Sequence, residues 1–139
     1  MLLIDTSVWI EIFRDKSKAK AIKFKKIVRE RKYYLPVFAQ MELLQGCKDE
    51  SEWNKLSFYL AVQNYFEPNY ETVWRNSARL YFELRRKGIT VRSNIDCAIA
   101  VTALENNLLV LHCDRDFEAI AKHTVLKQQN IKQQLSQIE

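Results

Sequence analysis

The sequence predicts an α/β fold in which helices cover both faces of a short, mainly parallel sheet, that is, an α/β/α sandwich. Short apolar segments alternate with longer segments whose apolar residues recur at helical spacing, and this alternation is typical of parallel sheets. The chain has 139 residues, of which 47% are apolar, enough for one hydrophobic core and too few for two ordinary domains. We therefore expect a single domain without internal repeats or linkers.

In the first half of the chain, polar and helix-breaking residues separate the expected elements. Leu2–Ile4 is a short apolar strand, and Asp5 stands where it ends. Pro36 ends a second strand, and Gly46 is expected to end the helix after it, because helices commonly stop at glycine. The expected order is strand 2–4, helices beginning near residues 6 and 17, strand 33–35, helix 37–46, helix 49–60 and an edge strand at 65–68.

The second half contains the longest helical pattern. Over Tyr70–Arg86, apolar residues recur every three or four positions, and Gly88 closes the pattern. The remaining expected elements are helix 94–106, strand 108–112, a short helix from residue 114 and a strand near 124–127. Residues 128–139 are rich in glutamine, so we expect a polar tail or a weakly held helix outside a domain of residues 1–127.

The composition excludes several classes of protein. No apolar run approaches the roughly 20 residues of a membrane span, and the first one meets an acid too early for a signal peptide, so we expect a cytoplasmic protein. Cys47, Cys97 and Cys113 lie far apart and form no C-x-x-C pair, which argues against a disulfide framework. With only His112 and His123 in addition, a zinc cluster is not indicated.

Positive charge is concentrated in one segment. Residues 16–32 contain nine basic residues and one acid, a net charge of +8 against +5 for the whole chain, so the remainder carries −3. This distribution suits a polyanion partner such as nucleic acid. The alternative is a solvated helix, because Ala21, Phe24 and Val28 form an apolar stripe that would turn the lysines toward water.

Acidic residues follow two of the predicted strands. Asp5 comes after the first strand, and Asp114 and Asp116 come after the last long one, at the carboxyl ends where open parallel sheets bind ligands. Asp96 lies in the first turn of its helix, and Glu42 lies within the helix after Pro36. Each acid also has a local explanation as a helix cap, a capping-box residue or a surface residue.

Helical spacing predicts that two of these acids point inward. Asp96 shares one side of its helix with Ala100 and Ala103, and Glu42 follows Phe38 by four residues. A buried carboxylate needs a partner. Several carboxylates at one place stay ionised only when a cation offsets their repulsion, and oxygen ligands favour Mg²⁺ or Mn²⁺. Two such ions about 4 Å apart can activate water and stabilise a leaving oxygen, which is nuclease chemistry.

Four segments together resemble a known family. "LLIDTSVWIEIF", "ELLQG", "IDCAIAVTAL" and "LLVLHCDRDFEAIAKHT" occur in the order and at about the spacing found in PIN-domain ribonucleases, and most closely resemble the VapC toxins of bacterial toxin–antitoxin pairs. The resemblance extends to about Lys127. It implies a homodimeric α/β/α sandwich that cuts RNA phosphodiester bonds as a magnesium-dependent endoribonuclease, using metal-activated water. It also implies inhibition by a small VapB-like antitoxin bound over the active site.

The resemblance assigns roles to particular residues. It implies catalytic Asp5, Glu42, Asp96 and Asp114, metal ligands Asp5, Asp96, Asp114 and Asp116, a supporting Thr6, and RNA contacts from Arg92 and Asn94. Two alternatives stay open, a solitary RNA-processing PIN nuclease and a PIN module that binds RNA without cleaving it. The retained acids disfavour the second, because a binding module has no need for mutually repelling carboxylates.

Overall fold

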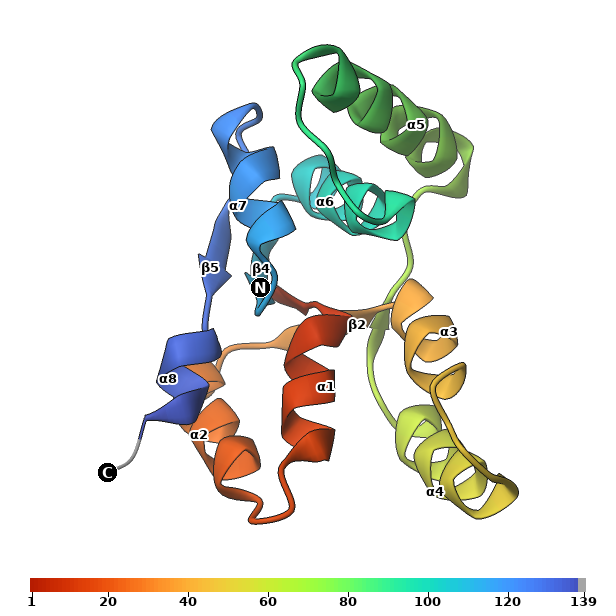
Figure 1. Ribbon diagram of the computed structural model, residues 1–139, viewed down its shortest axis with the longest axis vertical. Coiled ribbons are helices and arrows are strands. Elements are labelled where there is room, and N and C mark those ends of the chain that lie inside the picture. The colour runs from red at the N-terminus through yellow and green to blue at the C-terminus, as the bar shows by residue number, and fades with distance from the viewer. Residues whose placement is uncertain (138–139) are drawn as a thin grey trace.

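A five-stranded parallel sheet forms the middle layer of the computed structural model, which describes residues 1–137 (Figure 1). The strands lie in the order β3-β2-β1-β4-β5, so β1 is central. Their bounds are β1 (Leu2–Ile4), β2 (Tyr33–Pro36), β3 (Tyr65–Phe66), β4 (Leu109–His112) and β5 (Gln128–Asn130). The helices are α1 (Thr6–Arg14), α2 (Ala19–Val28), α3 (Phe38–Leu44), α4 (Glu50–Ala61), α5 (Tyr70–Arg86), α6 (Asn94–Asn106), α7 (Arg115–Lys122) and α8 (Lys132–Ser136).

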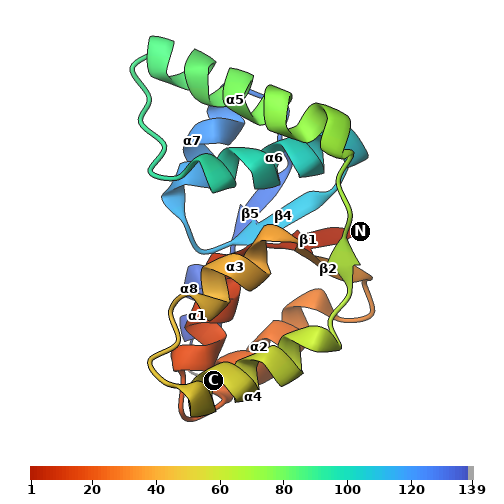
Figure 2. The ribbon, with the colours of Figure 1, turned by 90° about the vertical axis from the view of Figure 1, so that its right-hand side faces the viewer.

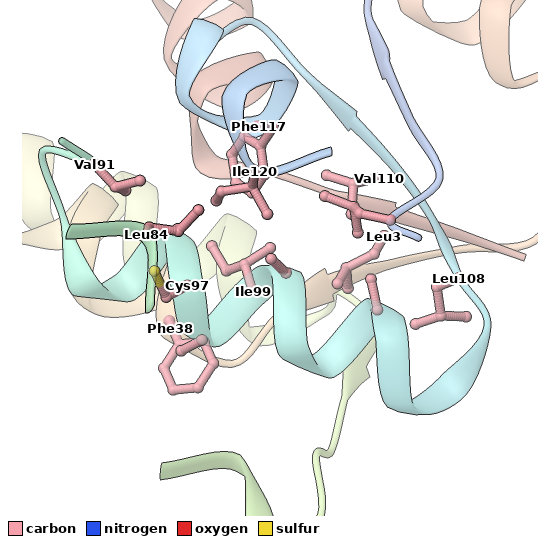
Figure 3. Close-up of a cluster of buried hydrophobic side chains, with 14 residues drawn as sticks. Leu3, Phe38, Leu84, Val91, Cys97, Ile99, Leu108, Val110, Phe117 and Ile120 are labelled. Atoms are coloured by element: carbon pink, nitrogen blue, oxygen red, sulfur yellow. The ribbon is translucent and has the colours of Figure 1, made fainter. Parts of the chain in front are cut away.

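Helices cover the sheet on both faces, as the sequence predicts (Figure 2). One face packs under α5, α6 and α7, and the other packs against α1, α2, α4 and α8. Alternation in β1 explains the two cores, because Leu3 enters the first while Leu2 and Ile4 enter the second. Figure 3 shows Leu3 and Val110 of the sheet gathered with apolar side chains of α6 and α7. The α/β/α sandwich is confirmed.

Side-chain caps set several helix starts. The Asp49 carboxylate accepts from Glu52 N, the Asn69 side chain from Glu71 N, and the Ser93 hydroxyl from Ile95 N. At the end of α5, Gly88 has φ +77°, the left-handed conformation that glycine adopts at low cost. Gly46 has no positive φ, and α3 ends earlier, at Leu44.

The C-terminal segment differs from its prediction. The strand expected near 124–127 lies at Gln128–Asn130, and the described part of the expected tail, residues 128–137, forms β5 and α8. β5 pairs with β4, and Ile131 and Leu135, four residues apart, are buried against the rest of the fold. The glutamine-rich composition hid this arrangement, because an edge strand tolerates polar side chains. Residues 138–139 lie outside the described part.

None of the helices in residues 1–137 is both long enough and apolar enough to cross a membrane.

Candidate active site

The site lies at the point in the sheet where the order of strand addition changes from one side of β1 to the other. From central β1 the chain builds β2 and β3 on one side and later β4 and β5 on the other, which makes the β1–β4 boundary a topological switch point. Ile4 and Leu111 are paired there, and Asp5 N donates to Leu111 O at 2.9 Å. Asp5 and Asp114 therefore emerge beside each other at the carboxyl edge of the sheet.

Asp5 is fixed by the turn that follows β1. The residue is only 3% exposed, and its Oδ2 accepts from Ser7 N at 3.0 Å and from Ser7 Oγ at 2.5 Å. Asp5 is thus the N-cap of α1, as the capping alternative predicted. Burial raises the pKa of Asp5, and the bonds from Ser7 oppose that rise. The residue both caps the helix and places a buried carboxylate at the sheet edge.

Glu42 is brought to Asp5 by α3. The Thr6 hydroxyl donates to Glu42 Oε1 at 2.8 Å, and this bond ties the start of α1 to α3. The Glu42 side chain is half-buried, and burial is the largest cause of its raised pKa, followed by the charges of Asp5 and Asp114. The Thr6 bond lowers the same pKa, because it stabilises the ionised carboxylate.

Asp96 faces inward from the first turn of α6. The residue is only 7% exposed, which confirms the inward orientation that its helical spacing predicted. Burial raises the pKa of Asp96 to about 8, and the charges of Asp5, Asp114, Glu42 and Asp116 raise it further in that order. The charges of the other four acids therefore all oppose the ionisation of Asp96.

Asp114 and Asp116 complete the acidic site from the loop after β4. Asp114 caps α7 by accepting from Asp116 N at 3.0 Å. Asp96, Asp114 and Asp116 each offer one oxygen, and these oxygens all lie within 4.8 Å of one another. Such a set of carboxylate oxygens fits Mg²⁺ or Mn²⁺, whose charge would offset the repulsion that raises the Asp96 pKa. Asp5 is outside this close group, although its charge acts on Asp96.

Comparison with known proteins identifies the fold at this point. The sequence model described as "PIN domain" matches residues 2–123. The chain belongs to the PIN-domain family. It is 32% identical over 129 residues to VapC ribonuclease Mb1587 of Mycobacterium bovis and, to the same extent, to ribonuclease VapC11 of Mycobacterium tuberculosis, with 91% of this chain and 96% of each relative covered. The resemblance to VapC-type PIN ribonucleases is thereby confirmed.

Solved structures support the same fold. VapBC-1 from nontypeable Haemophilus influenzae matches with a TM-score of 0.70 and 19% identity, covering 93% of this chain and 96% of that chain. FitAcB from Neisseria gonorrhoeae matches with a TM-score of 0.68 and 22% identity, covering 94% and 97%. At these identities the likeness shows the PIN fold.

Arg92 and Asn94, the two predicted RNA contacts, lie beside the acids of this PIN domain. The Arg92 guanidinium binds Asp114 Oδ1 at 2.7 Å and Asp116 Oδ2 at 3.2 Å, and its backbone N–H also donates to Asp116. Arg92 is thus paired with two acids of the site and is not part of a separate basic surface. With Asn94, Ser93 and Tyr81 it lines a shallow pocket of about 480 Å³ next to them.

Sequence reasoning missed two supporting residues of the PIN site. Ser7 Oγ accepts from Cys113 N at 2.9 Å while donating to Asp5, so it joins the loops after β1 and β4. His112 is fully buried, and its Nδ1 accepts from Asp114 N at 3.1 Å, which leaves Nε2 to donate to Gln128 at 2.6 Å. The sequence did contain a signal for each residue. Ser7 and His112 each lie two positions from a predicted site acid, a spacing at which a side chain can hydrogen-bond the neighbouring backbone or carboxylate.

Proposed function

We propose that this protein is a metal-dependent endoribonuclease and the toxin of a toxin–antitoxin pair. The observation that carries the proposal is the convergence of Asp5, Glu42, Asp96, Asp114 and Asp116 at the β1–β4 switch point, with the pKa of Asp96 raised to about 8. Local capping explains Asp5 and Asp114, but it does not explain buried Asp96 or half-buried Glu42. The curated relatives are named as ribonucleases, which supports RNA cleavage as the reaction that these acids serve.

The donor set fits a divalent cation. Asp96, Asp114 and Asp116 would hold Mg²⁺ or Mn²⁺, and Asp5 and Glu42 would contribute negative charge beside it. When bound, the cation would lower the pKa of water and offset charge on the scissile phosphate. Asp5, Glu42, Asp96 and Asp114 form the catalytic group in this proposal, and Asp116 is a further ligand.

The remaining residues hold this group in place. Thr6 orients Glu42, Ser7 orients Asp5, and His112 fixes the backbone of Asp114. Arg92 compensates the charge of Asp114 and Asp116, and from this position its guanidinium could turn to an RNA phosphate once a metal takes over that task. Asn94, at the adjacent pocket, is the second proposed RNA contact.

Exposed aromatic side chains support two protein partners. Phe13 of α1 and Tyr59 of α4 form an edge-to-face pair, and both remain partly open to solvent. Trp74 of α5 is half exposed against Phe38 of α3. We propose that the antitoxin covers the α1–α4 pair and that a second copy of this chain covers Trp74. Light scattering would then give a mass near twice 16.5 kDa for the isolated toxin.

Cleavage of total RNA by the purified protein tests the proposal. The comparison needs Mg²⁺, a chelator, the Asp96→Asn variant and the Asp49→Asn variant. Asp49 is the matched control, because it is an exposed N-cap aspartate of α4, outside the acidic site. Defined fragments should appear with wild type and Asp49→Asn in Mg²⁺, and should be lost with chelator or Asp96→Asn.

Three other outcomes would count against the proposal or favour one of the alternatives. Equal cleavage by wild type and Asp96→Asn would mean that a contaminant cuts the RNA, and the nuclease proposal would fail for those RNAs. RNA binding without cleavage would favour a non-catalytic PIN module. Metal-dependent cleavage of one defined precursor, by a protein that no antitoxin inhibits, would favour a solitary RNA-processing nuclease.

A further inference from the structure

A second charged surface lies away from the acids. An open pocket of about 640 Å³ is lined by Lys26, Ile27, Arg29, Arg31, Gln129 and Gln134, which we call the basic pocket. None of these lining residues is acidic. They come from α2, the turn after it, β5 and α8, and Figure 1 shows α2 and α8 side by side. The acids come from other elements, so the basic pocket is a separate surface.

Arg31 is built into the wall of the basic pocket. Its Nη2 donates to Ile27 O at 2.7 Å and its Nε to Val28 O at 3.3 Å, so the guanidinium caps carbonyls at the end of α2. The cap holds a permanent positive charge at the pocket. Substituting Arg31 would also disturb the helix end, which makes it a poor probe of binding.

Arg29 has a backbone conformation that favours glycine. Its φ is 53° and its ψ is −125°, and Arg31 N donates to Val28 O at 3.0 Å across the turn. These values match the second residue of a type II′ turn, where glycine is strongly preferred. A non-glycine residue there stores backbone strain, and such strain gathers at functional positions. Loss of the Arg29 side chain should therefore relieve strain.

We infer that the basic pocket binds phosphates of the RNA strand at a distance from the acidic site. This inference rests on the proposed function. Arginine binds phosphate oxygens in a forked geometry, and the glutamine amides can donate to phosphate or sugar. Residues 16–32 carry +8, whereas the remainder of the chain, which includes the acids, is net negative. A separate positive surface would attract an RNA strand whose phosphates the net negative remainder of the chain repels.

The lining favours RNA over a protein partner. Protein interfaces bury an apolar centre, and Ile27 is the one apolar residue among those lining the basic pocket. A polyanion instead gains from released counterions, so its affinity falls with salt by about 0.7 in log–log slope for each phosphate contact on a single strand. Removing Arg29 should lower that slope by about one contact.

The test measures RNA binding and folding stability in the same variants. The background is the full chain with Asp96→Asn, which should prevent cleavage, and the probe is a fluorescent single-stranded RNA titrated by anisotropy at several salt concentrations. The variants are Arg29→Gly, Arg29→Lys and Lys122→Gln. Lys122 is the matched control, because it is an exposed cation on α7 outside the basic pocket.

Opposite changes in affinity and stability are expected for Arg29→Gly. Its RNA affinity should fall about three- to tenfold at moderate salt, and its affinity should depend less steeply on salt than that of the background protein. Its unfolding midpoint should equal or exceed that of the background protein. Arg29→Lys should keep most of the affinity, and Lys122→Gln should keep all of it. Unchanged RNA binding by Arg29→Gly, or an equal loss in Lys122→Gln, would overturn the inference.

The two proposals can fail separately. If wild type cleaves RNA but Arg29→Gly binds RNA normally, the proposed role of the basic pocket is refuted and the nuclease proposal stands. If Arg29→Gly binds weakly but wild type never cleaves, the pocket stands as an RNA site and the nuclease fails. Competition by poly-glutamate as strong as that by unlabelled RNA would show an unselective charge surface and would also refute the inference.

Discussion

Replacing Asp96 by asparagine should stabilise the metal-free protein, although it removes a proposed catalytic group. The two side chains have nearly the same shape, so the substitution mainly removes a charge. Asp96 is 7% exposed, and burial together with four neighbouring carboxylates raises its pKa to about 8. Asparagine cannot ionise, so it avoids the cost of keeping a proton or a charge at this site.

The sign and size follow from proton linkage. Between an ordinary pKa near 3.8 and a folded pKa of about 8, the folded state holds a proton that the unfolded state has released. The free energy of unfolding therefore falls as pH rises through this window, by about 1.4 kcal/mol per pH unit. At pH 7 the cost reaches roughly 4 kcal/mol, and it levels off above pH 8. Asp96→Asn should recover most of it.

Urea unfolding of wild type and Asp96→Asn, followed by tryptophan fluorescence in chelator from pH 5 to pH 8.5, measures this difference. The gap between the two proteins should widen with pH. In Mg²⁺ the wild type should gain about 1.4 kcal/mol for each tenfold excess of the ion over its dissociation constant, and the variant should gain much less. A gap that is constant with pH, or an unstable variant at pH 8, would refute the reasoning.

Three further predictions concern other side chains. Thr6→Val should lower the free energy of unfolding, measured in urea, by about 1 kcal/mol. The loss should be larger at pH 8 than at pH 5, because the Thr6 hydrogen bond stabilises the ionised form of Glu42. Ile131→Ala should lower the free energy of unfolding by about 2–4 kcal/mol, because Ile131 is fully buried. The control Val125→Ala should change it by no more than about 0.5 kcal/mol, because Val125 is 88% exposed. Equal effects of the two substitutions would contradict a packed C-terminal segment. Arg92→Gln should lower the Mg²⁺ concentration needed for half-maximal thermal stabilisation by up to about fivefold, since the ion no longer displaces a guanidinium from the acids, and a weaker Mg²⁺ response would contradict this.

The candidate site was partly predictable from local patterns. The spacing of Asp96 relative to Ala100 and Ala103 indicated an inward side chain, because helical periodicity fixes which residues share a side. The Arg92 pairing with Asp114 and Asp116 was not predictable, since it joins residues 22 and 24 positions apart in sequence. His112 was missed for a similar reason, because its partner Gln128 lies in a strand that the sequence had marked as a tail.

The sequence by itself determined the alternation of strands and helices, the single domain and the presence of acids at strand ends. Periodicity, caps and turn residues act over a few positions and are therefore visible in the sequence. Only the tertiary structure decided that β1 and β4 are neighbours, that Asp96, Asp114 and Asp116 meet within 4.8 Å, and that Arg29 and Gln129 share one pocket. These facts depend on strand order and long-range packing, which bring distant residues together by burying surfaces that local sequence does not specify.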